Sequence, residues 1–297
     1  ADEIIKSGKA TQNEPEVLDC GKYAGMTTLE ARKAILADLE AGGYIKEIEP
    51  LKHDVGTCYR CHTNIEPMVS KQWFVKMRPL ADRVLENQKN KDTKVNFVPT
   101  RYEKIMNHWM EITYDWCISR QRAWGVPIPI FYCEDGTPVI DQKVFDHVSA
   151  LFREFGSNVW FERDEKDLLP EGYTNEHSPN GIFKKEKDIM DVWFDSGSSH
   201  TGVLVERGLG YPADLYFEGS DQYRGWFNSS LIIGTAVHGK APYKTVLSHG
   251  FTLDGKGLKM SKSGGNAVDP IKTINKWGAD ILRLWATTVD FQSDVRI

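Results

Sequence analysis

From residue 188 onward, short apolar segments alternate with polar loops and helical segments, and this alternation constrains the fold more than any other feature. We expect strands at 191–194, 214–217 and 245–248, each followed by a polar loop. Strand, loop and helix repeated in this order are typical of a parallel α/β sheet. Ligands of such sheets bind beyond the carboxyl ends of the strands, where these loops lie. The sequence therefore predicts an α/β fold with a ligand site at that edge.

The rest of the chain predicts further elements. Helices are expected at 27–41, 78–90, 101–112 and 141–155, and extended segments at 95–98, 116–119 and 126–132. Thr27 and Glu30 have the spacing of a capping box, which supports the first helix. Asp269 and Pro270 begin a last helix as N-cap and first helical residue. Residues 163–187 are polar and are expected to form a surface insertion.

The charge of the chain is segregated along its 297 residues. The net charge is −5, which argues against a surface that binds nucleic acid throughout. Residues 71–104 hold nine basic and four acidic side chains, and residues 240–263 hold five lysines and one aspartate. Two interpretations stay open for these basic segments: solvated faces, or contact with a polyanion.

Cysteine usage and hydropathy point to the cytoplasm. Five cysteines at irregular spacing do not fit a secreted disulfide framework. There is no run of 18 apolar residues, and the first residues lack the apolar core of a signal peptide. The chain begins with Ala1 rather than Met, so we interpret it as a fragment.

The polar loops carry groups suited to nucleotide chemistry. Lys259 and Lys262 lie three residues apart, next to two glycines, and lysine is a point cation suited to phosphate oxygens. Residues 218–222 place two carboxylates and an amide at a strand end, where they could accept from ribose hydroxyls or an ammonium group. Trp193 and Trp226 flank these loops and could wall an apolar pocket or pack in the core.

Together these segments resemble a known family. Asp-Val-Trp-Phe-Asp-Ser-Gly (191–197), Glu-Gly-Ser-Asp-Gln-Tyr-Arg-Gly-Trp-Phe (218–227), Ser-His-Gly-Phe (248–251) and Lys-Met-Ser-Lys-Ser (259–263) closely resemble the second half of class I aminoacyl-tRNA synthetases. The isoleucyl branch fits best, over residues 115–297. Residues 1–114, with Cys-Tyr-Arg-Cys (58–61), look more like the valyl branch. A shared ancestor, a reconstruction or a recombinant chain would each give this pattern.

The resemblance implies ATP-dependent activation of an amino acid, followed by its transfer to the 3′ end of a tRNA. Lys262, helped by Lys259, would contact the phosphates of ATP, which would arrive as its Mg²⁺ complex. The adenosine side would be lined by His249, Gly250, Met260 and Ser261. The aminoacyl-adenylate would be held by Glu218, Gly219, Asp221 and Gln222, the last facing the amino group. The aliphatic side chain would lie against Trp193 and Trp226.

The resemblance also divides the chain. Residues 1–54 would be the exit of an editing insertion, 55–114 a connecting segment with the CxxC knuckle and a basic helix, 115–132 a strand segment of the catalytic fold, 133–187 a second insertion, and 188–297 the second half of a Rossmann-type domain. The family's His-Ile-Gly-His signature has no counterpart, because no two of the eight histidines are three residues apart. The chain therefore resembles a later half that needs an N-terminal half as partner and has little activity alone.

The cysteines leave a metal site open. Cys58 and Cys61 have the spacing of a zinc knuckle, and a tetrahedral site needs four ligands. In related enzymes a second CxxC completes the site, whereas the corresponding place here holds only Cys133. His53, His62 or Asp135 would have to supply the fourth ligand. Bound Zn²⁺ and a relic site without metal are both consistent with the sequence.

The sequence leaves four functions open. The first is an isoleucine–tRNA ligase fragment, with isoleucine, ATP and the isoleucine tRNA as partners, and the second is the same enzyme with valine and its tRNA. The third is a non-catalytic tRNA-binding module that retains the fold, and the fourth an unrelated nucleotidyltransferase. The missing histidine signature favours the third over the first for the isolated chain, whereas the intact lysine loop favours the first, because a binding module would not need it.

Overall fold

The computed structural model describes residues 20–58, 61–65, 70–261 and 264–297. The chain forms two compact units. The first comprises the described residues up to Trp73, together with Gln121–Ala123 and Pro127–Ile189, and the second comprises Phe74–Arg120, Trp124–Val126 and Met190–Ile297. No helix in the described ranges is both long and apolar enough to cross a membrane. The five-part division expected from the sequence stays a prediction.

Helix α2 (Thr28–Ala41), which follows the 3₁₀ turn η1 (Gly21–Tyr23), confirms the helix predicted at 27–41. The Thr27 hydroxyl accepts from the Glu30 amide, and the Glu30 carboxylate accepts from the Thr27 amide, which completes the capping box. Leu29 and Leu36 are 58% and 43% exposed. The apolar side of α2 is therefore left uncovered by the residues that the structure describes.

Residues 127–189 of the first unit are built around the fully buried Trp160. Their elements are β5 (Phe131–Tyr132), α5 (Gln142–Phe155), α6 (Val159–Glu162), α7 (Glu165–Leu168) and β6 (Lys184–Lys185), with β7 (Ile189–Met190) at the chain boundary to the second unit. Strands β5 and β6 pair antiparallel. The surface insertion predicted at 163–187 is wrong in part, because Leu168 and Phe183 are buried in the same core as Trp160.

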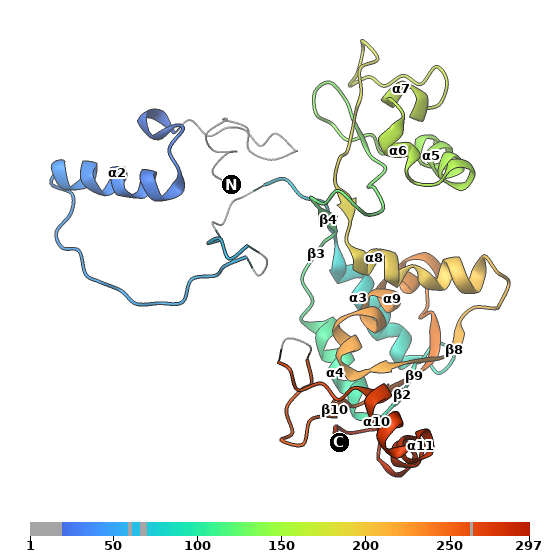
Figure 1. The fold of residues 1–297 in the computed structure, drawn as a ribbon. Coiled ribbons are helices and arrows are strands. Elements are labelled where there is room, and N and C mark those ends of the chain that lie inside the picture. The colour runs from blue at the N-terminus through green and yellow to red at the C-terminus, as the bar shows by residue number, and fades with distance from the viewer. Residues whose placement is uncertain (1–19, 59–60, 66–69, 262–263) are drawn as a thin grey trace. The chain divides into compact units, whose positions relative to one another are not determined.

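A parallel sheet forms the centre of the second unit (Figure 1). Its strands lie in the order β2 (Asn96–Val98), β9 (Tyr243–His249) and β8 (Ala213–Gly219), which confirms the strands predicted at 95–98, 245–248 and 214–217. Phe97, Val246 and Tyr216 are in register across the three strands and are all buried. They belong to a core that also includes buried residues of α3 (Met77–Lys89) and α9 (Trp226–His238).

The remaining elements of this unit are short or peripheral. They are β1 (Phe74–Val75), α4 (Arg101–Glu111), β3 (Trp116–Cys117), β4 (Ser119–Arg120), α8 (Val192–Gly197), the π-helical turn η2 (Thr201–Val205), the 3₁₀ turn η3 (Ser220–Arg224), β10 (Thr252–Leu253), α10 (Pro270–Trp277), α11 (Ala279–Thr288) and β11 (Val295–Arg296). Helices α3, α4 and α5 confirm those predicted at 78–90, 101–112 and 141–155. The Asp269 carboxylate accepts from the Ile271 amide at 2.8 Å, so α10 begins as predicted.

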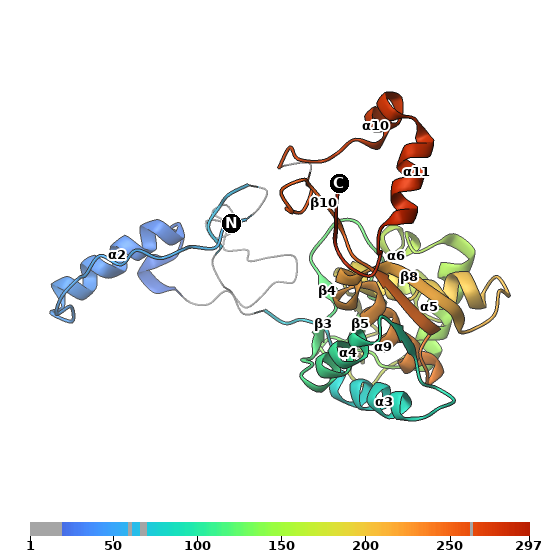
Figure 2. The ribbon, with the colours of Figure 1, turned by 90° about the horizontal axis from the view of Figure 1, so that it is seen from below.

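One face of the parallel sheet is open. Leu215 and Phe217 of β8 point away from the core side and are 51% and 56% exposed. Helices α10 and α11 lie beyond the sheet on the side away from α3 (Figures 1 and 2). Parallel sheets are normally covered on both faces. Among the described residues, this face of β8 has no such cover.

The strand predicted at 191–194 is wrong, because these residues begin helix α8. The Asp191 carboxylate accepts from the Trp193 amide at 3.3 Å, and the Phe194 amide donates to the Asp191 carbonyl at 2.7 Å. Gly197 lies so close to α9 that a Cβ there would be 2.9 Å from the backbone of Ser229. An N-cap and close packing against α9 therefore override the strand-like run of apolar residues.

Candidate functional site

The carboxyl ends of β8 and β9 lie side by side, as the sequence predicted. Glu218 pairs in register with Ser248, and Gly219 with His249. The His249 Nδ1 donates to the Gly250 carbonyl at 2.7 Å, and its ring lies 5.3 Å from that of Phe217. The structure thus brings Glu218 and Gly219, predicted for the adenylate, and His249, predicted for the adenosine, to one sheet edge.

The turn after β8 is fixed by its own polar groups. The Glu218 carboxylate accepts from the Gly219 amide at 2.9 Å. The Gln222 side chain accepts from the Trp226 amide at 3.0 Å and donates to Asp221 at 3.2 Å. Gln222 therefore supports the first turn of α9, while Glu218 and Asp221 remain exposed to solvent.

Gly250 has a structural reason to be glycine. An added Cβ would lie 2.3 Å from the carbonyl carbon and oxygen of Ser293. The Gly250 amide donates to the Phe291 carbonyl at 2.8 Å, and the Phe251 amide donates to the Asp294 carboxylate at 2.8 Å. The chain after β9 is thus held tightly against residues 291–294.

The lysine loop is anchored by Asn266, a residue that the sequence interpretation missed. Its side-chain oxygen accepts from the Ser261 amide at 3.0 Å, and its nitrogen donates to the Lys259 carbonyl at 3.2 Å and to the Asp254 carboxylate at 2.9 Å. The bond from Asn266 is the main cause that lowers the pKa of Asp254. The Lys259 ammonium lies 5.4 Å from the centre of the Phe251 ring. Lys262, the predicted phosphate contact, lies outside the described residues.

Met260 also helps to shape this loop. Its sulfur accepts from the Val268 amide at 3.3 Å. Ser261 is exposed, and its hydroxyl accepts from the Gly264 amide at 2.9 Å. Hydrogen bonds therefore join residues before the predicted phosphate-binding lysine, Met260 and Ser261, to residues after it.

Trp193 lines a cavity of about 460 Å³, whereas Trp226 does not. The other lining residues include Trp109, Trp116, Arg224, Gly225 and Asn228. A Cβ at Gly225 would lie 2.8 Å from the Trp193 ring, so glycine lets the indole approach. Trp226 instead stacks on Tyr216 with ring centres 4.1 Å apart, and its indole nitrogen donates to the Ser196 carbonyl at 3.0 Å. The structure does not place the two predicted pocket tryptophans on the walls of one cavity.

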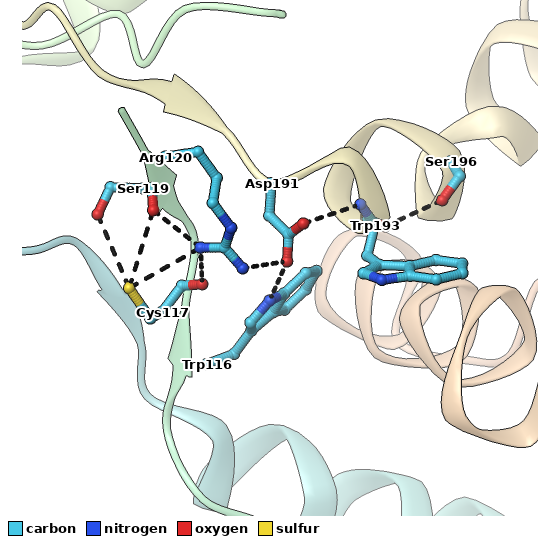
Figure 3. Close-up of polar contacts among 7 residues, drawn as sticks. All are labelled: Trp116, Cys117, Ser119, Arg120, Asp191, Trp193 and Ser196. Carbon is cyan, nitrogen blue, oxygen red and sulfur yellow. Dashed lines mark hydrogen bonds and ion pairs between the residues drawn. The ribbon is translucent and has the colours of Figure 1, made fainter. Parts of the chain in front are cut away.

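A buried carboxylate bonds to two residues that line this cavity, Trp116 and Trp193; Figure 3 shows these contacts. Asp191, which is 5% exposed, accepts from the Trp116 indole nitrogen at 2.9 Å and from the Arg120 guanidinium at 2.8 Å. Arg120 also donates to the carbonyls of Cys117 and Ser119, both at 2.8 Å. Burial, and secondarily the charge of Asp191, raises the pKa of nearby Asp195.

The predicted three-cysteine zinc site is not formed. Cys133 is 4% exposed and packs in the core around Trp160, whereas Cys61 is exposed. The Cys61 sulfur and the Thr63 hydroxyl oxygen lie 3.3 Å apart, and hydrogen bonds from Thr63, which favour the thiolate, are the main cause that lowers the pKa of Cys61 to about 7. Among the described residues, no three His, Cys, Asp or Glu side chains are grouped as metal ligands. The residues present therefore do not fit a bound zinc ion.

Two functional candidates were missed for different reasons. Asn266 follows the double glycine of the lysine loop, and an Asn in that setting is a local signal for side-chain bonds to the backbone. The Arg120–Asp191 pair joins residues 71 positions apart. No spacing pattern in a single sequence predicts such a contact.

The family model "tRNA synthetases class I (I, L, M and V)" matches residues 23–297. An isoleucine–tRNA ligase of Geobacillus thermodenitrificans is 56% identical over 93% of this chain and 29% of its own length. Isoleucine–tRNA ligase 1 of Oceanobacillus iheyensis is 53% identical over 99% of this chain and 31% of its own length. The chain thus spans about a third of the length of these relatives, and the match includes the region before residue 115.

A solved structure agrees in fold. Methionyl-tRNA synthetase of Mycobacterium tuberculosis, in complex with methionyl-adenylate, matches with a TM-score of 0.50 over 82% of this chain and 38% of its own. The identity is 19%, so this likeness concerns the fold alone. Together with the family model, it identifies the parallel sheet as part of a Rossmann-type α/β fold, as predicted.

Proposed function

The chain belongs to the class I tRNA synthetases that act on isoleucine, leucine, methionine and valine, and we propose that it supplies the later half of an isoleucine–tRNA ligase active site. The observation that carries the choice of isoleucine is the 53–56% identity to isoleucine–tRNA ligases. That identity extends into the residues before 115 whose motifs look valyl. Isoleucine, ATP with Mg²⁺ and the isoleucine tRNA are the proposed substrates, and the cytoplasm is the proposed compartment.

The sheet edge supports specific roles. Glu218 and Asp221 are exposed at the carboxyl end of β8, where Gly219 pairs with His249, and their carboxylates can accept from ribose hydroxyls. Gly219 is buried, and a Cβ there would lie 2.7 Å from an Asp221 carboxylate oxygen, so glycine permits this turn. Gln222 would orient the amino group of the substrate.

The lysine loop would act on the phosphates. Attack of the isoleucine carboxylate on the α-phosphorus of ATP forms the mixed anhydride and releases pyrophosphate. Negative charge develops on the departing phosphates, and fixed cations stabilise such charge more in the transition state than in the ground state. Lys262 and Lys259 would supply those cations, and Asn266 would hold the loop in place. Transfer to the tRNA 3′ end would follow from the same site.

A lysine substitution tests this assignment. The chain would be combined with the N-terminal half of the Geobacillus thermodenitrificans relative, and isoleucine-dependent ATP–pyrophosphate exchange measured. We expect Lys262→Ala to lower kcat by roughly 10²–10³ while isoleucine KM changes little. Lys272→Ala, in exposed α10, is the matched control. Equal losses in kcat and in isoleucine affinity would show that the loop only binds substrate.

A further inference from the structure

We propose that Asp191 is a positioning residue that holds two indole walls, Trp116 and Trp193, of the amino-acid pocket in a fixed relation. The inference rests on the proposed function, because it takes the cavity beside Trp193 as the place of the amino-acid side chain. The family resemblance assigns no substrate contact to Asp191, Arg120 or Trp116.

One carboxylate reaches both walls. Its Oδ2 accepts from the Trp116 indole nitrogen at 2.9 Å, and its Oδ1 accepts from the backbone amide of Trp193 at 3.3 Å (Figure 3). The first bond fixes the Trp116 ring directly, and the second fixes the start of α8, from which the Trp193 ring extends. Both indoles line the same cavity of about 460 Å³.

Arg120 makes this arrangement rigid. Its guanidinium donates to Oδ2 of Asp191 at 2.8 Å. The same guanidinium also donates to the backbone carbonyls of Cys117 and Ser119. A buried carboxylate without a cationic partner would be strongly destabilised. The Arg120 guanidinium supplies that partner for the Asp191 carboxylate, which is 5% exposed. The two carboxylate oxygens together accept from three donors: this guanidinium, the Trp116 indole and the Trp193 amide.

Fixed walls matter because the discrimination required is small. Isoleucine and valine differ by one methylene, and such a difference in an apolar pocket is worth roughly a 10–200-fold preference. A tryptophan ring that can tilt would close on the smaller side chain and reduce that preference. Elsewhere in the cavity lining, the Arg224 guanidinium lies 4.8 Å from the centre of the Trp109 ring, and the described contacts give that indole no such carboxylate anchor.

The test uses the tryptophan indole signals of the ¹⁵N-labelled chain, combined with the unlabelled N-terminal half of the Geobacillus thermodenitrificans relative. Trp116→Phe removes one signal and so assigns it, while the aromatic wall, the Asp191–Arg120 pair and the cap of α8 remain. Asp191→Asn keeps the shape, but either orientation of the amide places its NH₂ group against a donor. Titration with isoleucine and with valine then gives the ratio of the two dissociation constants for each variant.

We expect the Trp116 signal to move upfield in Asp191→Asn, and the preference for isoleucine to fall at least about threefold in both variants. The melting temperature is measured alongside, so that a loss of folding in Asp191→Asn leaves Trp116→Phe to decide. The controls are Asp214→Asn, an exposed carboxylate paired with Lys244, and Trp277→Phe, an exposed indole. Both should keep the wild-type preference.

The outcomes separate the two claims. An isoleucine response in the wild-type chain with an unchanged preference in Trp116→Phe overturns the positioning role and leaves the proposed function standing. If the wild-type chain associates with the N-terminal half and its indole signals still do not respond to isoleucine, the assignment of the cavity as the amino-acid pocket is overturned, and with it the role of Asp191 there.

Discussion

At the scale of single residues, Gly250 links the end of β9 to the segment 291–294. A Cβ at this position would lie 2.3 Å from the Ser293 carbonyl, which is backbone and cannot rotate away. We expect Gly250→Ala to lower the free energy of unfolding by about 1–3 kcal/mol, the usual cost of overpacking. Urea unfolding measures this, with Gly202→Ala as control because nothing lies within 4 Å of a Cβ there. Equal stability of the two variants would show that residues 291–294 move without cost.

His200 gives the second prediction at this scale. It is 1% exposed, and burial, with a smaller contribution from the charge of His238, lowers the pKa of His200 to about 4. In the unfolded chain the His200 imidazole takes up a proton near pH 6.5, whereas in the folded chain it does so only near pH 4. As the pH falls from about 6.5 toward 4, the free energy of unfolding should drop by up to about 3 kcal/mol from this group.

The measurement is urea unfolding at several pH values in that window. His200→Asn should flatten the slope of stability against pH, whereas His53→Asn, at an exposed histidine, should leave it unchanged. A slope in His200→Asn as steep as in the wild type would mean that other groups govern the acid sensitivity.

At the scale of elements, the lysine loop depends on Asn266. Replacing Asn266 with alanine removes the acceptor of the Ser261 amide and the donor to Lys259 and Asp254. One hydrogen bond of this kind is worth about 1 kcal/mol, so we expect the Ser261 amide to exchange with solvent about five- to tenfold faster. Asn180→Ala, which removes only a bond to Glu134 in the first unit, is the control. Unchanged exchange at Ser261 would show that the loop is held by other contacts.

Elements with local signals were predictable from the sequence. The capping box of α2, the Asp269–Pro270 start of α10 and the apolar runs of β8 and β9 each lie within a few residues, and all are confirmed. Residues 191–194 contain the same kind of apolar run, but the helix there depends on packing against α9, far along the chain. The candidate site follows the same division: the positions of Glu218, Gly219 and His249 at the strand ends were predicted, their roles stay a proposal, and the Arg120–Asp191 pair was not predicted.

At the scale of the whole molecule, two observations fit together: one face of β8 is open, and the chain spans only part of the length of its relatives. Leu215 and Phe217 are more than half exposed on a parallel sheet, a surface that such sheets normally bury. The chain matches only 29–31% of the length of the isoleucine–tRNA ligases. We therefore expect the proposed activity to need the N-terminal half, and the chain alone to show little exchange.

The measurement that tests the account most directly is ATP–pyrophosphate exchange by the chain combined with an N-terminal half from an isoleucine–tRNA ligase. Isoleucine and valine would be compared by kcat/KM, with the N-terminal half alone as control. We predict exchange that requires this chain and prefers isoleucine by roughly 10–200-fold. A preference for valine, or no exchange with either amino acid although the two halves associate, would contradict the assignment of this chain to an isoleucine-activating site.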